Sequence, residues 1–280
     1  MIWRCRNVTF DLSARTLVMG ILNVTPDSFS DGGRYLEPGA AVARGRELLA
    51  QGADLLDVGA ESTRPGSAPV PAGEQLRRLE PVLRALASEP GVVLSVDTRS
   101  AEVAARSLEW GAQVVNDVSA LGDPGMAAAV APTGAGLVLM HMRGTPATMQ
   151  GDLRYDDVVA EVAAHLRARM DLAAAAGIGE ERIALDPGIG FGKSAEQSLR
   201  LLARTDDLAR LGRPILVGTS RKSFLARLLG DAPPDRRLEA SLAAATIATL
   251  LGARILRVHD VAESVRAVKV AEAARIARAK

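Results

Sequence analysis

The chain has 280 residues, and its 34 Lys and Arg residues nearly balance its 33 Asp and Glu residues, giving a net charge of +1. This balance argues against a protein that binds nucleic-acid phosphates, which carries a basic excess. Aromatic residues make up only 3% of the chain, too few for a surface on which single-stranded bases stack. The single cysteine, Cys5, excludes an internal disulfide and a Cys-rich zinc site, and favours a cytoplasmic protein.

The sequence predicts neither a secretory signal nor a membrane-spanning segment. Charged residues interrupt the N-terminal stretch MIWRCRNVTFDLSAR, so we expect no secretory signal. The most apolar window, 240–253, is shorter than the roughly 20 residues that span a bilayer. We expect it to form a helix buried against the core of the protein.

Short apolar runs alternate with helical segments along the whole chain. The expected strands cover 17–22, 54–58, 92–96, 113–115, 136–140, 182–185, 214–217 and 253–258. Helical spacing lies between them, for example over 40–51, 73–88, 155–176, 196–211 and 261–277. Eight such units in about 250 residues are typical of a (β/α)8 barrel. We therefore predict one α/β domain over 1–280, a TIM barrel with a short N-terminal β-hairpin within residues 2–16.

Polar residues end most of the predicted strands. They are Asn23, Asp97, Asn116, His141 and Asp186. A single polar strand end is typical of a helix cap or loop anchor, and Asp97 in SVDTRSAEV also fits that interpretation. Because the carboxyl ends of barrel strands meet at one face, so many polar ends together predict the hydrogen-bonding floor of a pocket.

Two long loops follow the first two predicted strands. The segment 23–33 reads NVTPDSFSDGG, and 60–71 reads AESTRPGSAPVP. Either could be read as a connector, but connections in such units usually have about two to six residues. On neighbouring strand ends they predict a pair of loops that closes over a ligand and excludes water.

Later segments suggest contacts with a flat ring and an anion. In DPGIGFGKS (186–194), Pro187 stands where a phosphate-binding P-loop needs glycine, but the Asp186 carboxylate can accept two parallel N–H bonds, as from a 2-amino-pyrimidinone. Ser220 and Lys222 in GTSRKSF lie where a helix is expected to begin. This segment could bind an anion at the helix N-terminus, or it could be only an exposed basic turn. Arg257 and His259 share one side of the last strand. His165 lies in a helical pattern and is expected at the surface.

No spacing of His or Cys residues predicts a zinc site. A Mg²⁺ ion bound through one Asn or Asp and substrate phosphates needs no protein cage, and this interpretation stays open.

These motifs together resemble the dihydropteroate synthase family, in the same order along the chain. They are NVTPDSFSDGG, ESTRPG (61–66), SVDT (95–98), ND (116–117), HM (141–142), DPGIGFGK, SRK (220–222) and RVHD (257–260). Ala60, Ile189 and Thr219 depart from the common pattern without removing a polar ligand. The resemblance implies a TIM-barrel enzyme of folate biosynthesis that joins 6-hydroxymethyl-7,8-dihydropterin diphosphate to p-aminobenzoate and releases pyrophosphate. It also implies a homodimer and a target of sulfonamides.

Site residues follow from the resemblance, position by position. The pterin ligands are Asp97, Asn116, Asp186 and Lys222. The diphosphate ligands are Asn23, Thr63, Arg64, Arg257 and His259, with Asn23 also holding Mg²⁺. The p-aminobenzoate pocket comprises Phe29, Thr63, Pro65, Phe191 and Ser220. The residues expected to act in catalysis are Arg64, Asp97, Asp186, Lys222, Arg257 and His259.

Three other functions remain as alternatives. Methyl transfer from methyltetrahydrofolate to a corrinoid protein would use a similar barrel but would not need Arg64 or the SRK turn. An inactive pterin-binding paralogue would have lost ligands that are present here. Schiff-base chemistry would need a lowered pKa at Lys222.

Overall fold

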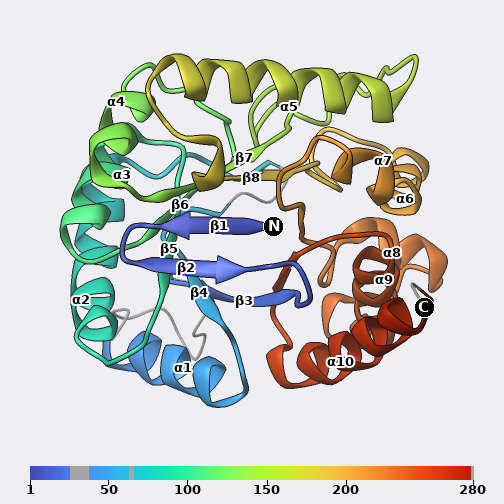
Figure 1. The fold of residues 1–280 in the computed structure, drawn as a ribbon, viewed down its shortest axis with the longest axis horizontal. Helices are drawn as coiled ribbons and strands as arrows, with labels where there is room; N and C mark the ends of the chain where they lie inside the picture. The colour runs from blue at the N-terminus through green and yellow to red at the C-terminus, as the bar shows by residue number, and fades with distance from the viewer. Residues whose placement is uncertain (26–37, 63–65, 279–280) are drawn as a thin grey trace.

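Eight parallel strands form the centre of the computed structural model, which describes residues 1–25, 38–62 and 66–278 (Figure 1). Hydrogen bonding places them in the order β8-β7-β6-β5-β4-β3-β10-β9, and an isolated bridge links Leu185 of β8 to Ile215, the residue before β9. The strands therefore form a nearly closed ring, which confirms the predicted barrel. The strands are β3 (Leu17–Asn23), β4 (Leu55–Gly59), β5 (Leu94–Asp97), β6 (Val114–Asp117), β7 (Gly136–Met140), β8 (Ile183–Asp186), β9 (Leu216–Val217) and β10 (Ile255–Val258).

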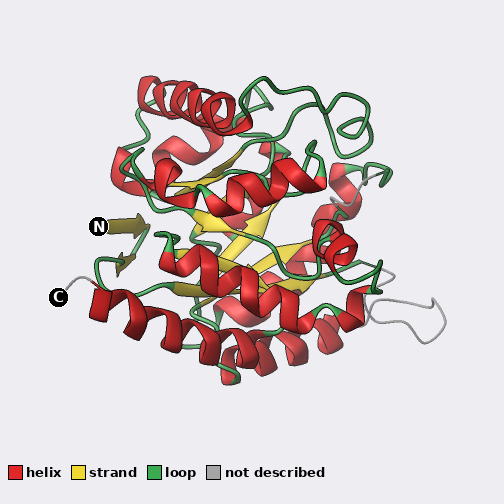
Figure 2. Cartoon of the chain, turned by 90° about the vertical axis from the view of Figure 1, so that its right-hand side faces the viewer, coloured by secondary structure: helices red, strands yellow, loops and turns green. Residues whose placement is uncertain are grey.

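Helices surround this barrel and cover the outer faces of its strands (Figure 2). The α-helices are α1 (Pro38–Ala50), α2 (Ala72–Ala87), α3 (Ala101–Glu109), α4 (Met126–Val130), α5 (Val158–Ala175), α6 (Ala195–Ala203), α7 (Thr205–Ala209), α8 (Ser223–Leu228), α9 (Leu238–Leu250) and α10 (Val261–Arg278). The helix expected over 196–211 is two helices, because it breaks at Arg204, whose ψ of 29° leaves the helical range. Short 3-10 turns cover Ala131–Thr133, Glu180–Arg182 and Pro234–Arg236.

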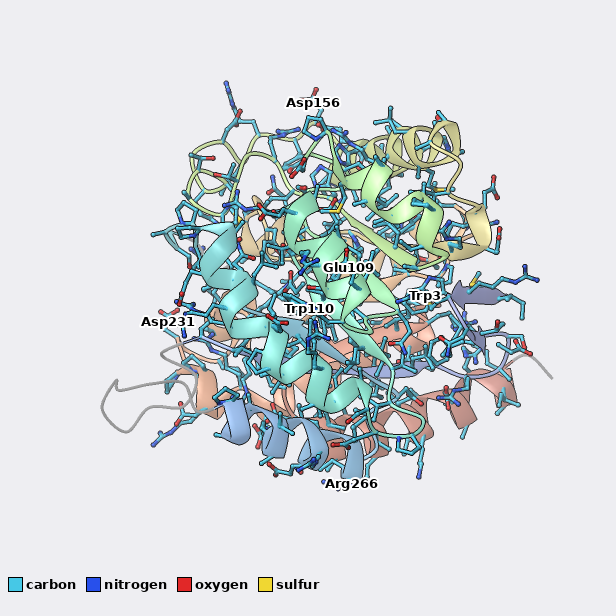
Figure 3. The ribbon with its side chains drawn as sticks, turned by 90° about the vertical axis from the view of Figure 1, so that its left-hand side faces the viewer. Trp3, Glu109, Trp110, Asp156, Asp231 and Arg266 are labelled. Atoms are coloured by element: carbon cyan, nitrogen blue, oxygen red, sulfur yellow. The ribbon has the colours of Figure 1, made fainter. Side chains whose placement is uncertain are left out.

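The predicted hairpin is present and lies across the N-terminal end of the barrel (Figures 1 and 3). Strands β1 (Ile2–Cys5) and β2 (Val8–Asp11) pair antiparallel. Trp3 and Cys5 are fully buried and pack with inward-facing side chains from the first halves of the barrel strands. The indole Nε1 of Trp3 donates to the carbonyl oxygen of Arg182 at 2.9 Å. The hairpin thus closes the end of the barrel where the strands begin.

Alternation of side chains along the strands divides the barrel interior into an apolar and a polar half. Leu55 on β4 and Val114 on β6 belong to the apolar cluster below the hairpin. Two residues further along, Asp57 and Asn116 point to the same side and are buried. The C-terminal half of the barrel is therefore the polar half, as the strand-end pattern predicts.

The apolar window 240–253 forms most of α9, which buries Ala244, Ala245 and Ala248, while Ile247 is 43% exposed. The expectation of a core helix therefore holds for one face of α9. Among the helices of the described residues, none is both long and apolar enough to cross a membrane.

Candidate active site

A buried ion pair network forms the polar floor of the barrel. The Arg257 guanidinium on β10 donates from Nε to Asp57 Oδ2 at 2.6 Å and from Nη2 to Asp97 Oδ2 at 2.7 Å. Asn116 donates from Nδ2 to the same Asp57 oxygen at 3.0 Å. Burial alone would lower the pKa of Arg257, but Asp57 and Asp97 together raise it, so the guanidinium stays charged. One cation thus faces two carboxylates from strands far apart in the sequence.

Several polar atoms of this floor are buried without a partner among the described residues. They are Oδ1 of Asp57, Oδ1 of Asp97, Oδ1 of Asn116 and the Ser95 hydroxyl. Burial raises the pKa of Asp97, while nearby Arg257 opposes this effect. Buried polar atoms are nearly always hydrogen-bonded in proteins. A group of unpaired acceptors at one place suits a bound water or a ligand that presents N–H donors.

Asp186 comes from the end of β8 and Lys222 from the turn after β9, the two edge strands in the hydrogen-bonded order. Asp186 ends β8, and its Oδ1 accepts the backbone N–H of Gly188 at 2.7 Å. Lys222 donates from Nζ to the carbonyl oxygen of Ile189 and lies 4.4 Å from the centre of the Phe191 ring. Burial raises the pKa of Asp186, and burial lowers the pKa of Lys222 to about 8, although each residue favours the charge on the other.

Lys193, which is buried, holds the glycine-rich loop of residues 188–193. Lys193 donates from Nζ to the carbonyl oxygens of Gly188 at 3.0 Å and Phe191 at 2.8 Å, and lies 2.9 Å from His141 Nδ1. Burial, assisted by Lys193, lowers the pKa of His141 to about 2, so this ring is neutral and can accept. A Cβ at Gly188 would lie 1.9 Å from the His141 carbonyl oxygen, so only glycine fits there.

The turn after β9 places Ser220 next to the last strand. Its Oγ lies 3.0 Å from His259 Nδ1 and accepts the His259 backbone N–H at 3.2 Å. Both Lys222 and Arg257 approach Gly218, so the structure brings Lys222, Arg257 and, through Ser220, His259 to one rim. Three carboxylates, of Asp57, Asp97 and Asp186, lie in the same polar half of the barrel.

The predicted Mg²⁺ ligand Asn23 ends β3, beside Gly59 of β4. The described residues hold no group of three or more His, Cys, Asp or Glu side chains suited to a metal ion. The carboxamide oxygen of Asn23 is of the kind that Mg²⁺ accepts. It would be one ligand among several, and the others would come from the diphosphate and water. Four predicted ligands, Phe29, Thr63, Arg64 and Pro65, lie outside the described residues.

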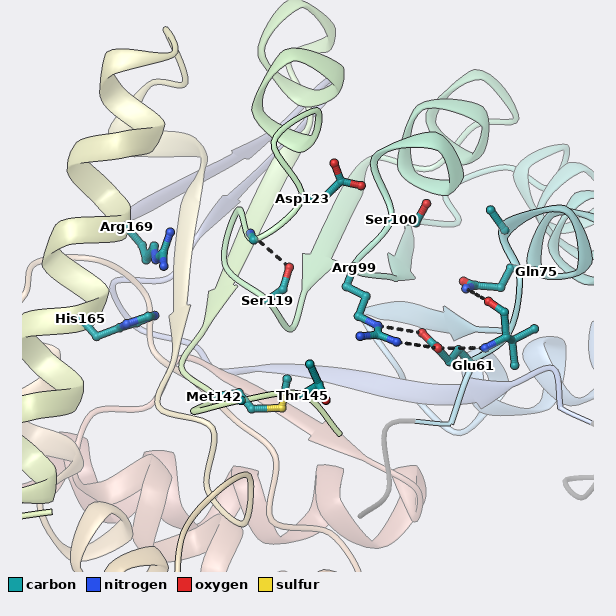
Figure 4. A pocket seen from close by; sticks show the side chains of 14 residues that line it. Glu61, Gln75, Arg99, Ser100, Ser119, Asp123, Met142, Thr145, His165 and Arg169 are labelled. Atoms are coloured by element: carbon teal, nitrogen blue, oxygen red, sulfur yellow. Dashed lines mark hydrogen bonds and ion pairs between the residues drawn. The ribbon is translucent and has the colours of Figure 1, made fainter. Parts of the chain in front are cut away.

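A pocket of about 620 Å³ opens beside this floor, between the loops after β4 to β7 and helix α5 (Figure 4). Arg99 donates to Glu61 on one wall, and His165 and Arg169 approach from α5 on the other. His165 is thus not a simple surface residue, because its ring packs edge-on against His141 with centroids 4.8 Å apart. Its Nε2 is buried and has no partner in the described part of the chain. The helical pattern of α5 did not show this contact, because it depends on the loop after β7.

Comparison with known proteins decides the family. Residues 19–259 match a family model described as pterin binding enzyme. The dihydropteroate synthase of Escherichia coli strain K12 is 48% identical over 256 residues, which cover 91% of this chain and 90% of that one. This chain belongs to the dihydropteroate synthase family.

Solved structures of that family agree with the fold. The Yersinia pestis dihydropteroate synthase, determined with a sulfonamide drug complex, has a TM-score of 0.93 and 45% identity, covering 99% of this chain and all of that one. The Xanthomonas albilineans dihydropteroate synthase with 4-aminobenzoic acid has a TM-score of 0.92 and 46% identity, covering 98% and 99% of the two chains.

Sequence reasoning missed three residues of the polar floor and its supporting loop. Asp57 is fully buried and accepts from both Arg257 and Asn116. A carboxylate inside the apolar run LLDVG was its signal, because an isolated charge in a strand is costly unless paired. Lys193 stands in the quoted motif DPGIGFGKS, but only the tertiary contacts reveal its acceptors. Ser95 gave no signal beyond its position two residues before Asp97.

Proposed function

We propose that this chain, as a member of the dihydropteroate synthase family, joins 6-hydroxymethyl-7,8-dihydropterin diphosphate to p-aminobenzoate and releases pyrophosphate, a step of folate biosynthesis. The observation that carries the site assignment is the group of buried acceptors on Asp57, Asp97 and Asn116 that have no partner among the described residues. A pterin ring presents N–H donors along one edge and a carbonyl oxygen on the other, which complements this arrangement.

In this proposal the pterin lies across the polar floor. The Asp186 carboxylate accepts from the amidine-like edge of the pyrimidinone ring, and Asp97 and Asn116 accept from its other N–H groups. Lys222 donates to the ring carbonyl oxygen. Ser220 and Phe191, which lie on the same rim, border the space assigned to p-aminobenzoate.

The proposed chemistry is dissociative. The bond between the pterin methylene carbon and the diphosphate oxygen breaks first, and the leaving group takes the electron pair. The electron-rich dihydropterin spreads the positive charge, and the neutral aromatic nitrogen of p-aminobenzoate then forms the C–N bond and loses a proton. No strong general base is required. In this proposal the Arg257 guanidinium and the His259 ring stabilise the negative charge on the leaving group.

We propose Mg²⁺ as the cofactor, bound by Asn23 and by oxygens of the diphosphate and water. When bound, it would neutralise charge on the leaving diphosphate. The predicted diphosphate ligand Arg64, and the p-aminobenzoate contacts Phe29, Thr63 and Pro65, stay part of this proposal on the basis of the family resemblance. A cytoplasmic location stays a prediction that rests on the single cysteine.

We further propose that the chain forms a homodimer. Three large apolar side chains are exposed on neighbouring elements. They are Leu228 on α8 (59% exposed), Leu229 directly after α8 (44%) and Ile247 on α9 (43%). Such side chains are favoured at contacts between copies of a chain. Sedimentation equilibrium checks this: Ile247→Lys should yield monomers, whereas Val270→Lys on α10, 69% exposed, should not.

A coupled pyrophosphate-release assay tests the activity. We expect release from the pterin diphosphate to depend on added p-aminobenzoate, and Asp186→Ala and Arg257→Ala each to reduce it at least about a hundredfold. Asp54→Ala and Arg254→Ala are matched controls, because they remove the same residue types near the opposite ends of the strands. Release without p-aminobenzoate dependence, or full activity in both site variants, would contradict the proposal.

The same assay separates the alternatives. A methyl transferase acting on a corrinoid protein would release no pyrophosphate, and an inactive paralogue would bind the pterin without turnover. A Schiff-base enzyme would be trapped by borohydride at Lys222, whose lowered pKa of about 8 arises from burial.

A further inference from the structure

The backbone at Arg221 adopts a conformation that its side chain does not favour. Residues 219–222 form a tight turn closed by the bond from the Lys222 N–H to the Thr219 carbonyl oxygen at 3.2 Å. Arg221 is the third residue of this turn and has φ of +60°. A turn with positive φ at that position strongly prefers Gly or Asn. Something outside the turn must therefore hold it in this shape.

Ser241 on α9 and Arg237, the residue before this helix, bind both backbone polar groups of Arg221. The Arg221 N–H donates to Ser241 Oγ at 3.0 Å, and Arg237 Nη1 donates to the Arg221 carbonyl oxygen at 2.8 Å. Arg237 and Ser241 are one helical turn apart, and the Ser241 hydroxyl donates to the Arg237 carbonyl oxygen at 2.6 Å. Arg237 is itself fixed, because its Nε donates to the Ala232 carbonyl oxygen at 2.7 Å.

The Arg221 side chain adds a second tether. Its Nε donates to Asp260 Oδ2 at 3.1 Å, which joins the turn to the residue that follows His259. The Asp260 backbone is tied in turn to α10, since its carbonyl oxygen accepts from the Ser264 hydroxyl at 2.6 Å. Thus the turn is fixed on its backbone by α9 and on its side chain by the loop after β10.

We propose that Arg237 and Ser241 are positioning residues for the p-aminobenzoate half of the site. They hold Arg221 in the left-handed conformation, and this sets the position of the preceding Ser220. This inference rests on the proposed function. Lys222 has its own anchor at the Ile189 carbonyl oxygen, so loss of either positioning residue should affect p-aminobenzoate more than the pterin.

The test measures kcat, and KM for each substrate, in Ser241→Ala and Arg237→Met. We expect KM for p-aminobenzoate to rise about tenfold in each variant, with kcat and KM for the pterin diphosphate within about twofold. Thr249→Ala removes a buried hydroxyl from the same helix, where it bonds only to a carbonyl oxygen of α9 among the described residues, and Arg236→Met removes the neighbouring exposed arginine. Both controls should leave all three constants unchanged.

The Arg221→Gly background distinguishes backbone positioning from general packing. Arg221→Gly removes the steric penalty for positive φ and also the bond to Asp260, so it serves as its own reference. Adding Ser241→Ala to Arg221→Gly should raise KM for p-aminobenzoate by less than about threefold, against about tenfold in the wild-type background. An unchanged KM in both single variants overturns the proposal, and so does an equal rise in KM from Ser241→Ala in the two backgrounds. Wild-type protein that shows no p-aminobenzoate-dependent release instead rejects the proposed function, and sulfonamide binding by calorimetry then provides the same comparison for the positioning residues.

Discussion

The two ends of the barrel interior have opposite chemistry. At the N-terminal end, Trp3 and Cys5 of the hairpin pack on apolar side chains, and the Trp3 indole has its hydrogen-bond partner. At the C-terminal end, Arg257 faces two carboxylates, and several buried acceptors lack partners in the described residues. Packed apolar contacts stabilise a fold, whereas unpaired buried polar groups cost stability. The contrast teaches that stability and ligand binding are assigned to opposite ends of the same strands.

The largest expected effect is at Arg257. Arg257→Met leaves Asp57 and Asp97 buried without their counter-charge, which should lower the free energy of unfolding by about 3–5 kcal/mol. Activity should fall at least about a hundredfold. Denaturant unfolding and pyrophosphate release measure the two effects. Adding Asp57→Asn to this variant should recover part of the stability but none of the activity, and recovered activity would show that the charge pair is structural only.

A loss of stability without a loss of activity is expected at the other end. Trp3→Ala removes a fully buried ring and should lower the free energy of unfolding by about 3–5 kcal/mol. Because the hairpin lies opposite the polar floor, kcat/KM should change less than about twofold under conditions where the variant is folded. Ile2→Ala, at a residue 43% exposed in the same strand, is the control. It should change neither the free energy of unfolding nor kcat/KM. A large fall in kcat/KM for Trp3→Ala would show that the two ends are coupled.

The polar floor should also respond to pH. Burial lowers the pKa of Lys222 to about 8 from an ordinary value near 10.5, so the ammonium is lost as pH rises through about 8. Pterin affinity should then fall, approaching tenfold per pH unit, in titrations from about pH 6 to about pH 10. Because the unfolded chain binds more protons between these two pKa values, the stability cost of burying the Lys222 ammonium decreases as pH rises from about 8 to about 10.5. Lys222→Arg should remove the fall in affinity, and a flat wild-type profile would contradict the assignment.

The smallest effect is a gain in stability at the floor itself. The Ser95 hydroxyl is buried without a partner in the described structure, so Ser95→Ala should raise the free energy of unfolding by about 0.5–1 kcal/mol. Ser107 on α3 has the same unpaired buried hydroxyl away from the floor and is the matched control. Both variants should be stabilised in thermal unfolding, but only Ser95→Ala should weaken pterin binding, by a few-fold. Equal pterin affinity in the two variants would place Ser95 outside the site.

Much of the architecture could be predicted because it depends on local periodicity. The run GLVLM (136–140) was predicted with the boundaries that β7 has, and the other strands within about two residues. Asp97 and Asp186 end β5 and β8, and Asn116 is one residue before the end of β6. Their place at the polar face could be predicted because the ends of parallel strands meet at one face. The break at Arg204 was missed, since the apolar spacing continues through both α6 and α7.

The sequence by itself determined the strand and helix alternation, the polar face and the family, because each is written in spacing or in short motifs. Only the tertiary structure decided which charges pair. Arg257 and Asp57 are 200 residues apart, and their contact exists because closure of the barrel brings β10 beside β3, with β4 next in order. The same holds for Lys193 with His141 and for Ser241 with Arg221. Local pattern fixes which face a side chain occupies, whereas its partner across the barrel follows from the stagger and closure of the strands.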